Sequence, residues 1–119
     1  MALENKKTNI RGRIKARRNT VQALYQWFIT NKSADEVIYE FEHDEYKLAK
    51  TDVDYFKLLL RGTITHRREL DSRIADLLDR PVDELDTIER AILHIGCYEL
   101  EHHSAVSYTH LTLPTKRIV

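Results

Sequence analysis

Five basic side chains fall within eight consecutive residues, and this is the densest group of chemically active residues in the sequence. They are Arg11, Arg13, Lys15, Arg17 and Arg18. Guanidinium and ammonium groups bind phosphate oxygens, and arginine also stacks on unpaired bases. Residues 1–18 hold seven Lys/Arg and one acid, whereas the rest of the chain holds 12 Lys/Arg and 18 Asp/Glu. The net charge of zero therefore hides a basic end, which suits a polyanion or, alternatively, a solubilising tail.

A helix over residues 11–30 would hold these cations at fixed spacing. Apolar residues recur there with a helical period and form one arc: Ile14, Val21, Leu24, Tyr25 and Phe28. A neighbouring arc is basic or polar: Arg11, Lys15, Arg18, Gln22 and Gln26. The pattern predicts one helix with a buried face and a basic face, which favours a specific nucleic-acid surface over a flexible tail. Residues 1–10 lack periodicity and are expected to be a disordered basic arm.

Histidines and the single cysteine are the other candidates for chemistry: His66, His94, His102, His103 and Cys97. Their spacings match no standard zinc pattern, and adjacent His102 and His103 cannot share a helix face. Cys97 falls between core positions and is expected to be a small buried residue. The sequence contains no Gly-rich phosphate loop, nucleophile elbow or paired acid motif. We therefore expect no enzyme activity, no cofactor and no metal site.

The composition predicts one helical domain. Apolar residues make up 42% and charged residues 32% of the 119 residues, with only three Gly and two Pro. Such a composition is globular and favours long helices. One cysteine allows no disulfide framework, and no segment resembles a signal peptide or a membrane span. We expect a cytoplasmic protein that does not bind membranes.

Start and stop signals divide the remainder into further helices. Ser33 and Glu36 form an S-x-x-E capping box ahead of a core face of Val37, Ile38, Phe41 and Tyr46. After a break at residues 47–50, Thr51 and Asp54 repeat the pattern and open one long helix, or two helices kinked near Gly62. The expected core residues of this segment are Val53, Phe56, Leu59, Leu60, Thr63, Ile64, Leu70, Ile74, Leu77 and Leu78.

The long helical segment ends before Pro81, and a last helix covers residues 86–100 with Asp86 as its N-cap. Its expected core residues are Ile88, Ala91, Ile92, Ile95 and Tyr98. The sequence thus predicts an all-α bundle.

The last 14 residues differ from the rest of the chain. Residues 106–119, VSYTHLTLPTKRIV, have no helical period and no acids. The first ten of them equal one reading frame of a transposon end and adaptor used in DNA library preparation. We expect residues 106–119 to be a non-native tail and residues 11–105 to be the native helical domain.

Four blocks of sequence resemble the NusB family. They are ARRNTVQALYQW at residues 16–27, DYFKLL at 54–59, Leu70-Asp71, and LDTIERAILHIGCYEL at 85–100. His94 stands where the family usually has arginine. The resemblance implies an all-α helical bundle of the NusB type, here lacking its last helices. It also implies a non-enzymatic, RNA-binding transcription antitermination factor.

Partners and site residues follow from the same resemblance. It implies binding to boxA RNA together with a small-subunit ribosomal protein acting as NusE. Other Nus factors and RNA polymerase complete the assembly, which supports transcription of ribosomal RNA operons. The family's arginine-rich motif places RNA contacts at Arg13, Lys15, Arg17 and Arg18, although a solvated helix face is the alternative. Arg17 lies close to the apolar arc, so its stem could instead pack.

The resemblance also suggests two protein-binding residues. Tyr25 is expected near the partner surface, with a core position as the alternative. Glu89 is expected to contact the basic ribosomal protein, or else to stabilise the N-terminus of its helix.

Two other functions stay open. The same helical domain begins ribosomal RNA cytosine methyltransferases, so the chain could be the N-terminal RNA-binding domain of such an enzyme. It could also be a purely protein-binding module, with weak RNA affinity that does not depend on sequence.

Overall fold

Helices joined by turns make up the part of the chain that the structure describes. A computed structural model describes residues 2–78 and 81–102, with side chains from residue 10 onward. The helices are α1 (Ala2–Ile29), α2 (Ala34–Glu42), α3 (Val53–Thr65), α4 (Arg67–Leu77) and α5 (Thr87–His102), with a short 3-10 helix η1 (Val82–Glu84). The predicted all-α class is confirmed. The expected non-native tail at residues 106–119 lies outside the described residues.

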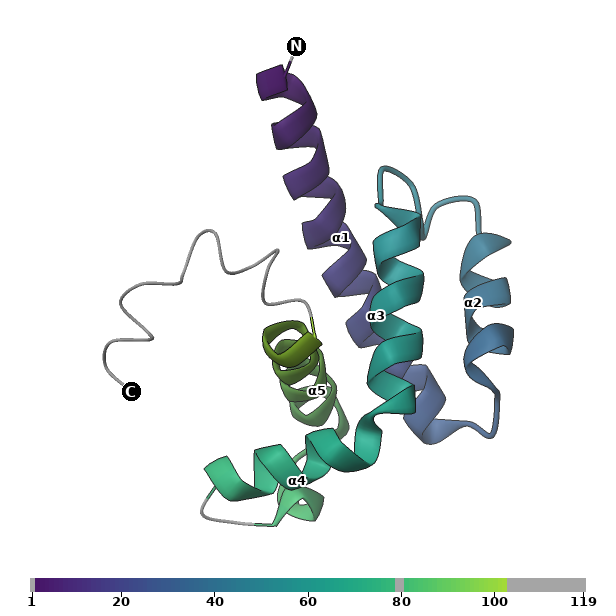
Figure 1. The fold of residues 1–119 in the computed structure, drawn as a ribbon. Helices are drawn as coiled ribbons and strands as arrows, with labels where there is room; N and C mark the ends of the chain where they lie inside the picture. Colours follow the sequence, from purple (N-terminus) through teal and green to yellow (C-terminus); the bar gives the residue numbers. More distant parts are fainter. Residues whose placement is uncertain (1, 79–80, 103–119) are drawn as a thin grey trace, which may run out of the picture.

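Helix α1 is the centre of the arrangement. It contacts α2, α3 and α5, while α3 also contacts α2 and α5. Helix α4 runs across the end of this group and packs on α5 (Figure 1). None of the described helices combines the length and the apolar character needed to cross a membrane.

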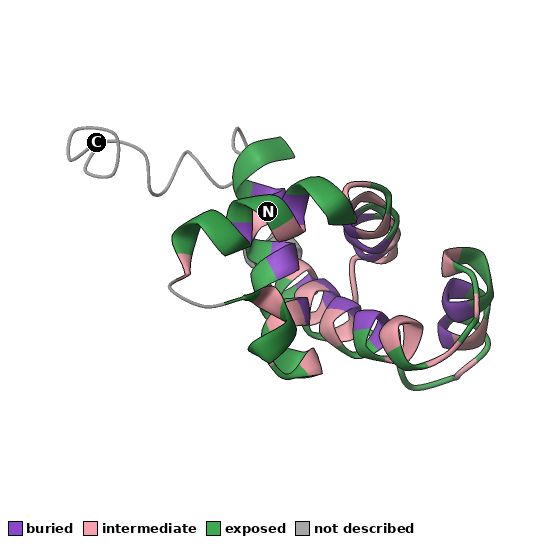
Figure 2. Ribbon diagram, turned by 90° about the horizontal axis from the view of Figure 1, so that it is seen from below, coloured by how far each residue is buried: buried purple, intermediate pink, exposed green. Residues whose placement is uncertain are grey.

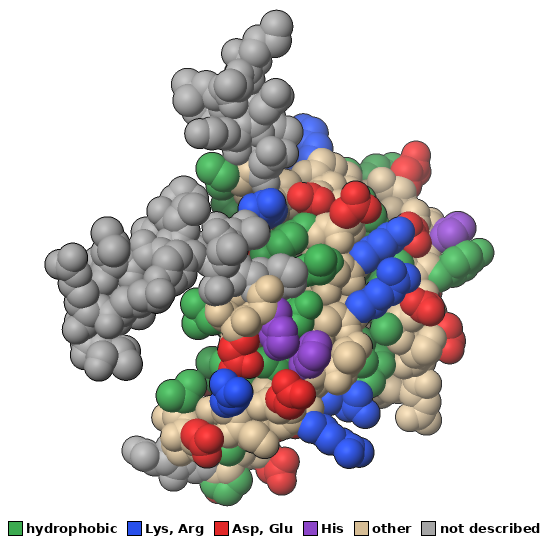
Figure 3. Space-filling model, viewed as in Figure 1, with side chains coloured by type: hydrophobic (Ala, Val, Ile, Leu, Met, Phe, Trp, Pro, Cys, Tyr) green, Lys and Arg blue, Asp and Glu red, His purple; other side chains and the backbone are tan. Residues whose placement is uncertain are grey.

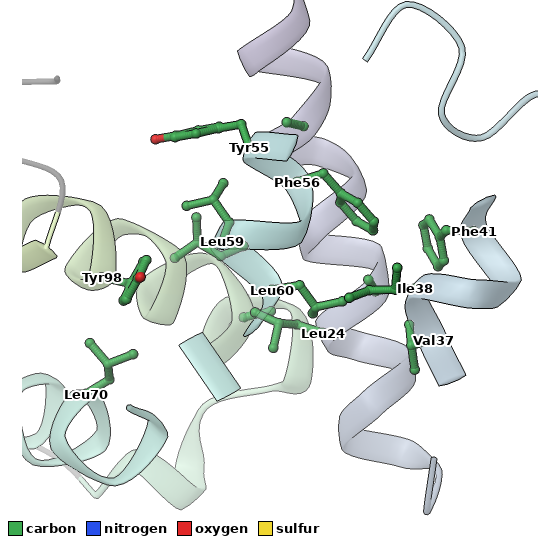
Figure 4. Close-up of a cluster of buried hydrophobic side chains, with 14 residues drawn as sticks. Leu24, Val37, Ile38, Phe41, Tyr55, Phe56, Leu59, Leu60, Leu70 and Tyr98 are labelled. Carbon is green, nitrogen blue, oxygen red and sulfur yellow. The ribbon is translucent and has the colours of Figure 1, made fainter. Parts of the chain in front are cut away.

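One hydrophobic cluster joins the helices. Leu24 of α1 lies beside Leu60 of α3, and Phe56 of α3 faces Phe41 of α2 (Figure 4). Leu59 of α3 and Val37 and Ile38 of α2 belong to the same cluster. The Phe41 and Phe56 rings stack with their centroids 5.4 Å apart. Buried positions follow the inward faces of the helices (Figure 2). Each fully buried Leu or Phe contributes roughly 1.5–3 kcal/mol to folding.

Side-chain caps fix two helix starts where the sequence placed them. Ser33 and Glu36 form the predicted capping box of α2. Asp86 accepts from the Glu89 amide at 2.8 Å, as its predicted N-cap role requires. For α3 the prediction was wrong by one residue, because Asp52 and not Thr51 caps the helix by accepting from the Tyr55 amide.

Three other expectations differ from the structure. Helix α1 begins at Ala2, so residues 2–10 are helical and not a disordered arm. This segment contains Ala, Leu, Glu and Lys without Gly or Pro, and such residues extend an existing helix at little cost. The long helical segment breaks at His66, not near Gly62. In α1 and α5 the buried face is rotated from the predicted one.

The rotation leaves four expected core residues of these two helices exposed: Ile14, Tyr25, Ile88 and Ile92. Tyr46, in the turn after α2, and Leu77, the last residue of α4, are exposed as well. In α1 the buried positions are instead Ala16, Thr20, Ala23 and Leu24. Small side chains bring helix axes close together, so the face with the best packing was not the most hydrophobic one. Hydrophobicity alone misplaced these residues for that reason.

Gly62 marks the closest approach of α3 and α5. A Cβ built on Gly62 would lie 2.1 Å from Cζ and 2.2 Å from the hydroxyl of Tyr98. The Tyr98 ring is buried and stacks on His66 and His102, so it has little room to move. Only glycine allows this contact.

We predict that Gly62→Ala lowers the free energy of unfolding by about 1–3 kcal/mol, because the new methyl group displaces the Tyr98 ring. Urea denaturation followed by circular dichroism measures the change. Gly96→Ala is the matched control, since a Cβ on Gly96 of α5 meets nothing within 4 Å. It should raise stability by about 0.5–1 kcal/mol through helix propensity. Equal effects of the two substitutions would contradict the close approach.

Candidate nucleic-acid interface

Helix α1 presents an exposed row of residues along its outer face. The row, here called the α1 stripe, consists of Arg11, Ile14, Arg18, Gln22, Tyr25 and Ile29. Its members are three or four positions apart and so lie on one side of the helix. Half-buried Lys15 lies one position from Ile14 at the edge of the stripe. The stripe therefore combines cations with exposed apolar side chains, a mixture that suits both phosphates and bases.

The predicted RNA-binding residues are not equivalent. Arg18 is exposed, whereas Arg13, Lys15 and Arg17 are half-buried. Arg13, Lys15 and Arg18 form no salt bridge with any described residue. The guanidinium of Arg13 lies 5.1 Å from the centre of the Tyr55 ring, and its Nε is buried without a hydrogen-bond partner among the described atoms. Among the described residues, these three cations thus have no acidic partner.

Arg17 has a different environment, because it pairs with a glutamate from the far end of the sequence. Its Nε donates to both carboxylate oxygens of Glu99 on α5, at 3.0 and 2.9 Å. The Tyr55 hydroxyl of α3 donates to the same carboxylate. The Glu99 side chain is only 11% exposed, against 39% for Arg17. These three residues, here called the Glu99 hub, join α1, α3 and α5.

The hub alters the acidity of Tyr55. Burial, the hydrogen bond to Glu99 and the negative charge of Glu99 together raise the pKa of the Tyr55 hydroxyl to about 12. Each cause disfavours the phenolate, so Tyr55 keeps its proton and remains a donor to the carboxylate.

A second ionic cluster joins α4 to α5. Arg90 Nη2 donates to Asp71 Oδ2 at 3.0 Å. His94 Nε2 lies 2.8 Å from Asp71 Oδ1, within ion-pair range but without hydrogen-bond geometry. The other His94 nitrogen, Nδ1, lies 2.7 Å from the Arg90 carbonyl oxygen. Both ring nitrogens thus lie close to oxygen atoms, one on α4 and one on α5.

This cluster uses residues from two of the sequence blocks, Leu70-Asp71 and residues 85–100. His94 is 1% exposed and packs near the Phe28 ring. Its burial keeps it out of contact with solvent and with molecules that bind at the surface. These two sequence blocks therefore contain residues that hold α4 and α5 together.

The two predicted partner-binding residues lie on different helices. Tyr25 is 39% exposed and belongs to the α1 stripe, so it is not a core residue. Glu89 is exposed in the first turn of α5, and its carboxylate accepts from the Asp86 amide at 3.3 Å. With the Asp86 cap this makes a capping box, which gives Glu89 a structural role at the helix start. Contact with a partner stays a prediction for both residues.

Comparison with known proteins agrees with this arrangement. Residues 14–110 match the model of the NusB family. The chain is 43% identical over 97 residues to a protein of Xylella fastidiosa strain 9a5c, covering 81% of this chain and 60% of that protein. It is 42% identical over 97 residues to a protein of Xanthomonas oryzae pv. oryzae strain PXO99A, covering 81% of this chain and 61% of the relative.

A third similar protein, from Stenotrophomonas maltophilia strain K279a, is 40% identical over 96 residues, with 81% and 60% covered. All three relatives carry the name "Transcription antitermination protein NusB". That name places these relatives in transcription antitermination. This chain spans about three fifths of the length of these relatives.

We predict that Arg17→Ala lowers the free energy of unfolding by roughly 1–3 kcal/mol, since it leaves the nearly buried Glu99 carboxylate without its cation. Arg18→Ala removes the same charge from an exposed position one residue away and should change stability by less than about 0.5 kcal/mol. Urea denaturation of both variants tests the difference. Equal stability of the two would contradict the structural role of Arg17.

The raised pKa of Tyr55 predicts a loss of stability in strong alkali. An unfolded tyrosine ionises near pH 10, whereas folded Tyr55 ionises at about 12. The contribution of Tyr55 to the free energy of unfolding is therefore complete below about pH 10, and it is lost as the pH rises through about 12. Urea midpoints from pH 9 to 12 should fall more steeply for the native sequence than for Tyr55→Phe. Tyr39→Phe, at an exposed tyrosine, is the control and should keep the native slope.

Proposed function

The chain belongs to the NusB family, and from that premise we propose that it is an RNA-binding transcription antitermination factor. In this proposal it binds boxA RNA together with a small-subunit ribosomal protein acting as NusE. The complex, with other Nus factors and RNA polymerase, supports transcription of ribosomal RNA. The relatives described above bear the name of the stand-alone factor, which favours this role over a methyltransferase domain.

The α1 stripe is the observation that carries the RNA-binding part of the proposal. Arg11 and Arg18 are exposed on a regular helix and, among the described residues, have no acidic partner. Two exposed arginines on other helices differ in this respect, since Arg61 pairs with Asp35 and Arg73 pairs with Glu101. Unpaired cations on a rigid helix keep their attraction for phosphate and lose little conformational entropy when they bind.

The four predicted residues would act in different ways. Arg18 and Lys15 bind phosphates directly from the stripe and its edge. Arg13, stacked near Tyr55, lies one turn before Arg17 and would approach RNA from the same side of the hub. Arg17 acts mainly by fixing the rotation of α1 through Glu99, while the exposed part of its side chain remains within reach of RNA.

Protein binding would use the other end of the stripe. Tyr25 lies seven residues after Arg18, a separation of about 10 Å along a helix. RNA and the ribosomal partner could therefore bind neighbouring segments of α1 at the same time. Glu89, exposed at the start of α5, would offer a carboxylate to the basic ribosomal protein.

We predict that Arg18→Ala weakens binding of boxA RNA about tenfold and lowers the dependence of log affinity on log salt by about 0.7, because one phosphate contact is lost. Lys15→Ala should act in the same direction. Fluorescence anisotropy at several salt concentrations, with the ribosomal partner present, measures both quantities. Arg68→Ala is the matched control, since Arg68 is an exposed arginine on α4 without a described salt bridge.

The same measurement separates the alternatives. Equal affinity for boxA and a scrambled RNA would refute specific RNA binding and would favour a protein-binding module. An equal loss for Arg68→Ala and Arg18→Ala would show that only overall charge matters, which would refute the role of the α1 stripe.

A further inference from the structure

Three metal-ligating side chains that neither the hub nor the α1 stripe uses lie together on the surface. They are His66 at the junction of α3 and α4, Glu69 in the first turn of α4, and His102 in the last turn of α5. We propose that these residues form a binding site for a divalent transition-metal ion such as Zn²⁺. This site is independent of the RNA-binding proposal.

The geometry of the three side chains supports the proposal. One ligand atom from each residue lies within 4.8 Å of those from the other two. His66 Nδ1 is 3.6 Å from Glu69 Oε2, and the two imidazole rings stack with centroids 4.3 Å apart. Figure 3 shows a pair of histidine side chains in contact on the surface, with acidic side chains beside them.

The three ligand atoms need to move only a short way to surround a metal ion. Ligand atoms about 2.0–2.1 Å from a tetrahedral zinc ion lie about 3.3 Å from one another. The longest separation must therefore shrink by roughly 1.5 Å, within reach of side-chain rotation. Glu69 is exposed and its side chain can rotate toward the histidines, whereas ring stacking holds His66 and His102 next to each other.

The surrounding residues hold His66 in place without using its nitrogens for the helix start. His66 is the N-cap residue of α4, yet its side chain makes no capping hydrogen bond. The Tyr98 ring stacks on both histidines, with centroids 5.9 Å from His66 and 4.8 Å from His102. Tyr98 is itself held against Gly62, so the packing that requires glycine there also orients the histidine pair.

The ligand set selects the class of ion. Two imidazoles and one carboxylate suit zinc and the later first-row transition metals, whereas magnesium and calcium prefer oxygen ligands alone. Three protein ligands leave one coordination position for water or for a group from a partner. Bound metal would link the α3–α4 junction to the end of α5.

His66 and His102 were candidate ligands in the sequence, but their spacing led us to expect no metal site. Glu69 follows His66 by three residues, and His102 follows Glu69 by 33. This spacing matches no short metal-binding motif. The packing of α4 on α5 brings His102 back to His66, and only the fold reveals that proximity.

The test is calorimetric titration of the tag-free, chelator-treated chain with ZnCl₂. We expect one Zn²⁺ per chain with micromolar or tighter affinity, and no binding of MgCl₂. Both His102→Ala and Glu69→Gln should weaken zinc binding at least tenfold. His43→Ala, at an exposed histidine near the end of α2, is the matched control and should bind as the native sequence does.

Spectroscopy with Co²⁺ provides a second measurement on the same variants. Ligand-field absorption typical of four-coordinate Co²⁺ should appear with the native chain and disappear with His102→Ala. Circular dichroism checks that each variant keeps its helices. Absence of binding below millimolar Zn²⁺, or native affinity in both His102→Ala and Glu69→Gln, would overturn the proposal.

Discussion

A carboxylate that is almost removed from water governs the arrangement of the helices. Glu99 would be costly to bury alone, because an unpaired charge in a protein interior loses its hydration without compensation. Arg17 and Tyr55 supply the compensating groups, one from each neighbouring helix. Since Arg17 must face α5, the rotation of α1 about its axis is fixed. The neighbouring face, with Arg11 and Arg18, is thereby turned to solvent.

The same principle recurs at the other end of α5. The Asp71 carboxylate on α4 accepts a hydrogen bond from Arg90 and lies next to the His94 ring. This second ionic cluster fixes the orientation of α4 relative to α5. The apolar cluster supplies most of the driving force for folding, but Leu and Phe side chains tolerate small rotations of the helices. Ion pairs with directional hydrogen bonds do not tolerate them. The two clusters therefore specify orientations that hydrophobic contact leaves open.

The helices, their caps and the all-α class were predictable from the sequence because they depend on residues close together in the chain. Ser33 with Glu36, and Asp86 with the Glu89 amide, are local pairs of this kind. The buried face of α1 was not predictable in detail. Ile14 and Tyr25 looked like core residues, and the small residues that really pack, such as Ala16 and Ala23, carry little hydrophobic weight.

The candidate site shows the same division. Its location on the first helix could be predicted from charge and spacing. The different role of Arg17 could not, because its partner lies 82 residues away. The grouping of His66 with His102 was hidden for the same reason, since periodicity describes single helices and not the contacts between them.

The separation of 82 residues between Arg17 and Glu99 in the sequence also has a consequence for synthesis of the protein. A ribosome that adds about 5–20 residues per second needs roughly 4–16 s to travel from one codon to the other. Helix α1 therefore leaves the ribosome before Glu99, which fixes its rotation, has been synthesised. Until α5 is made, Arg17 lacks its carboxylate partner, and α1 can be oriented only by its apolar contacts with α2 and α3. The ion pair that fixes the rotation of α1 thus forms only after α5 has been synthesised.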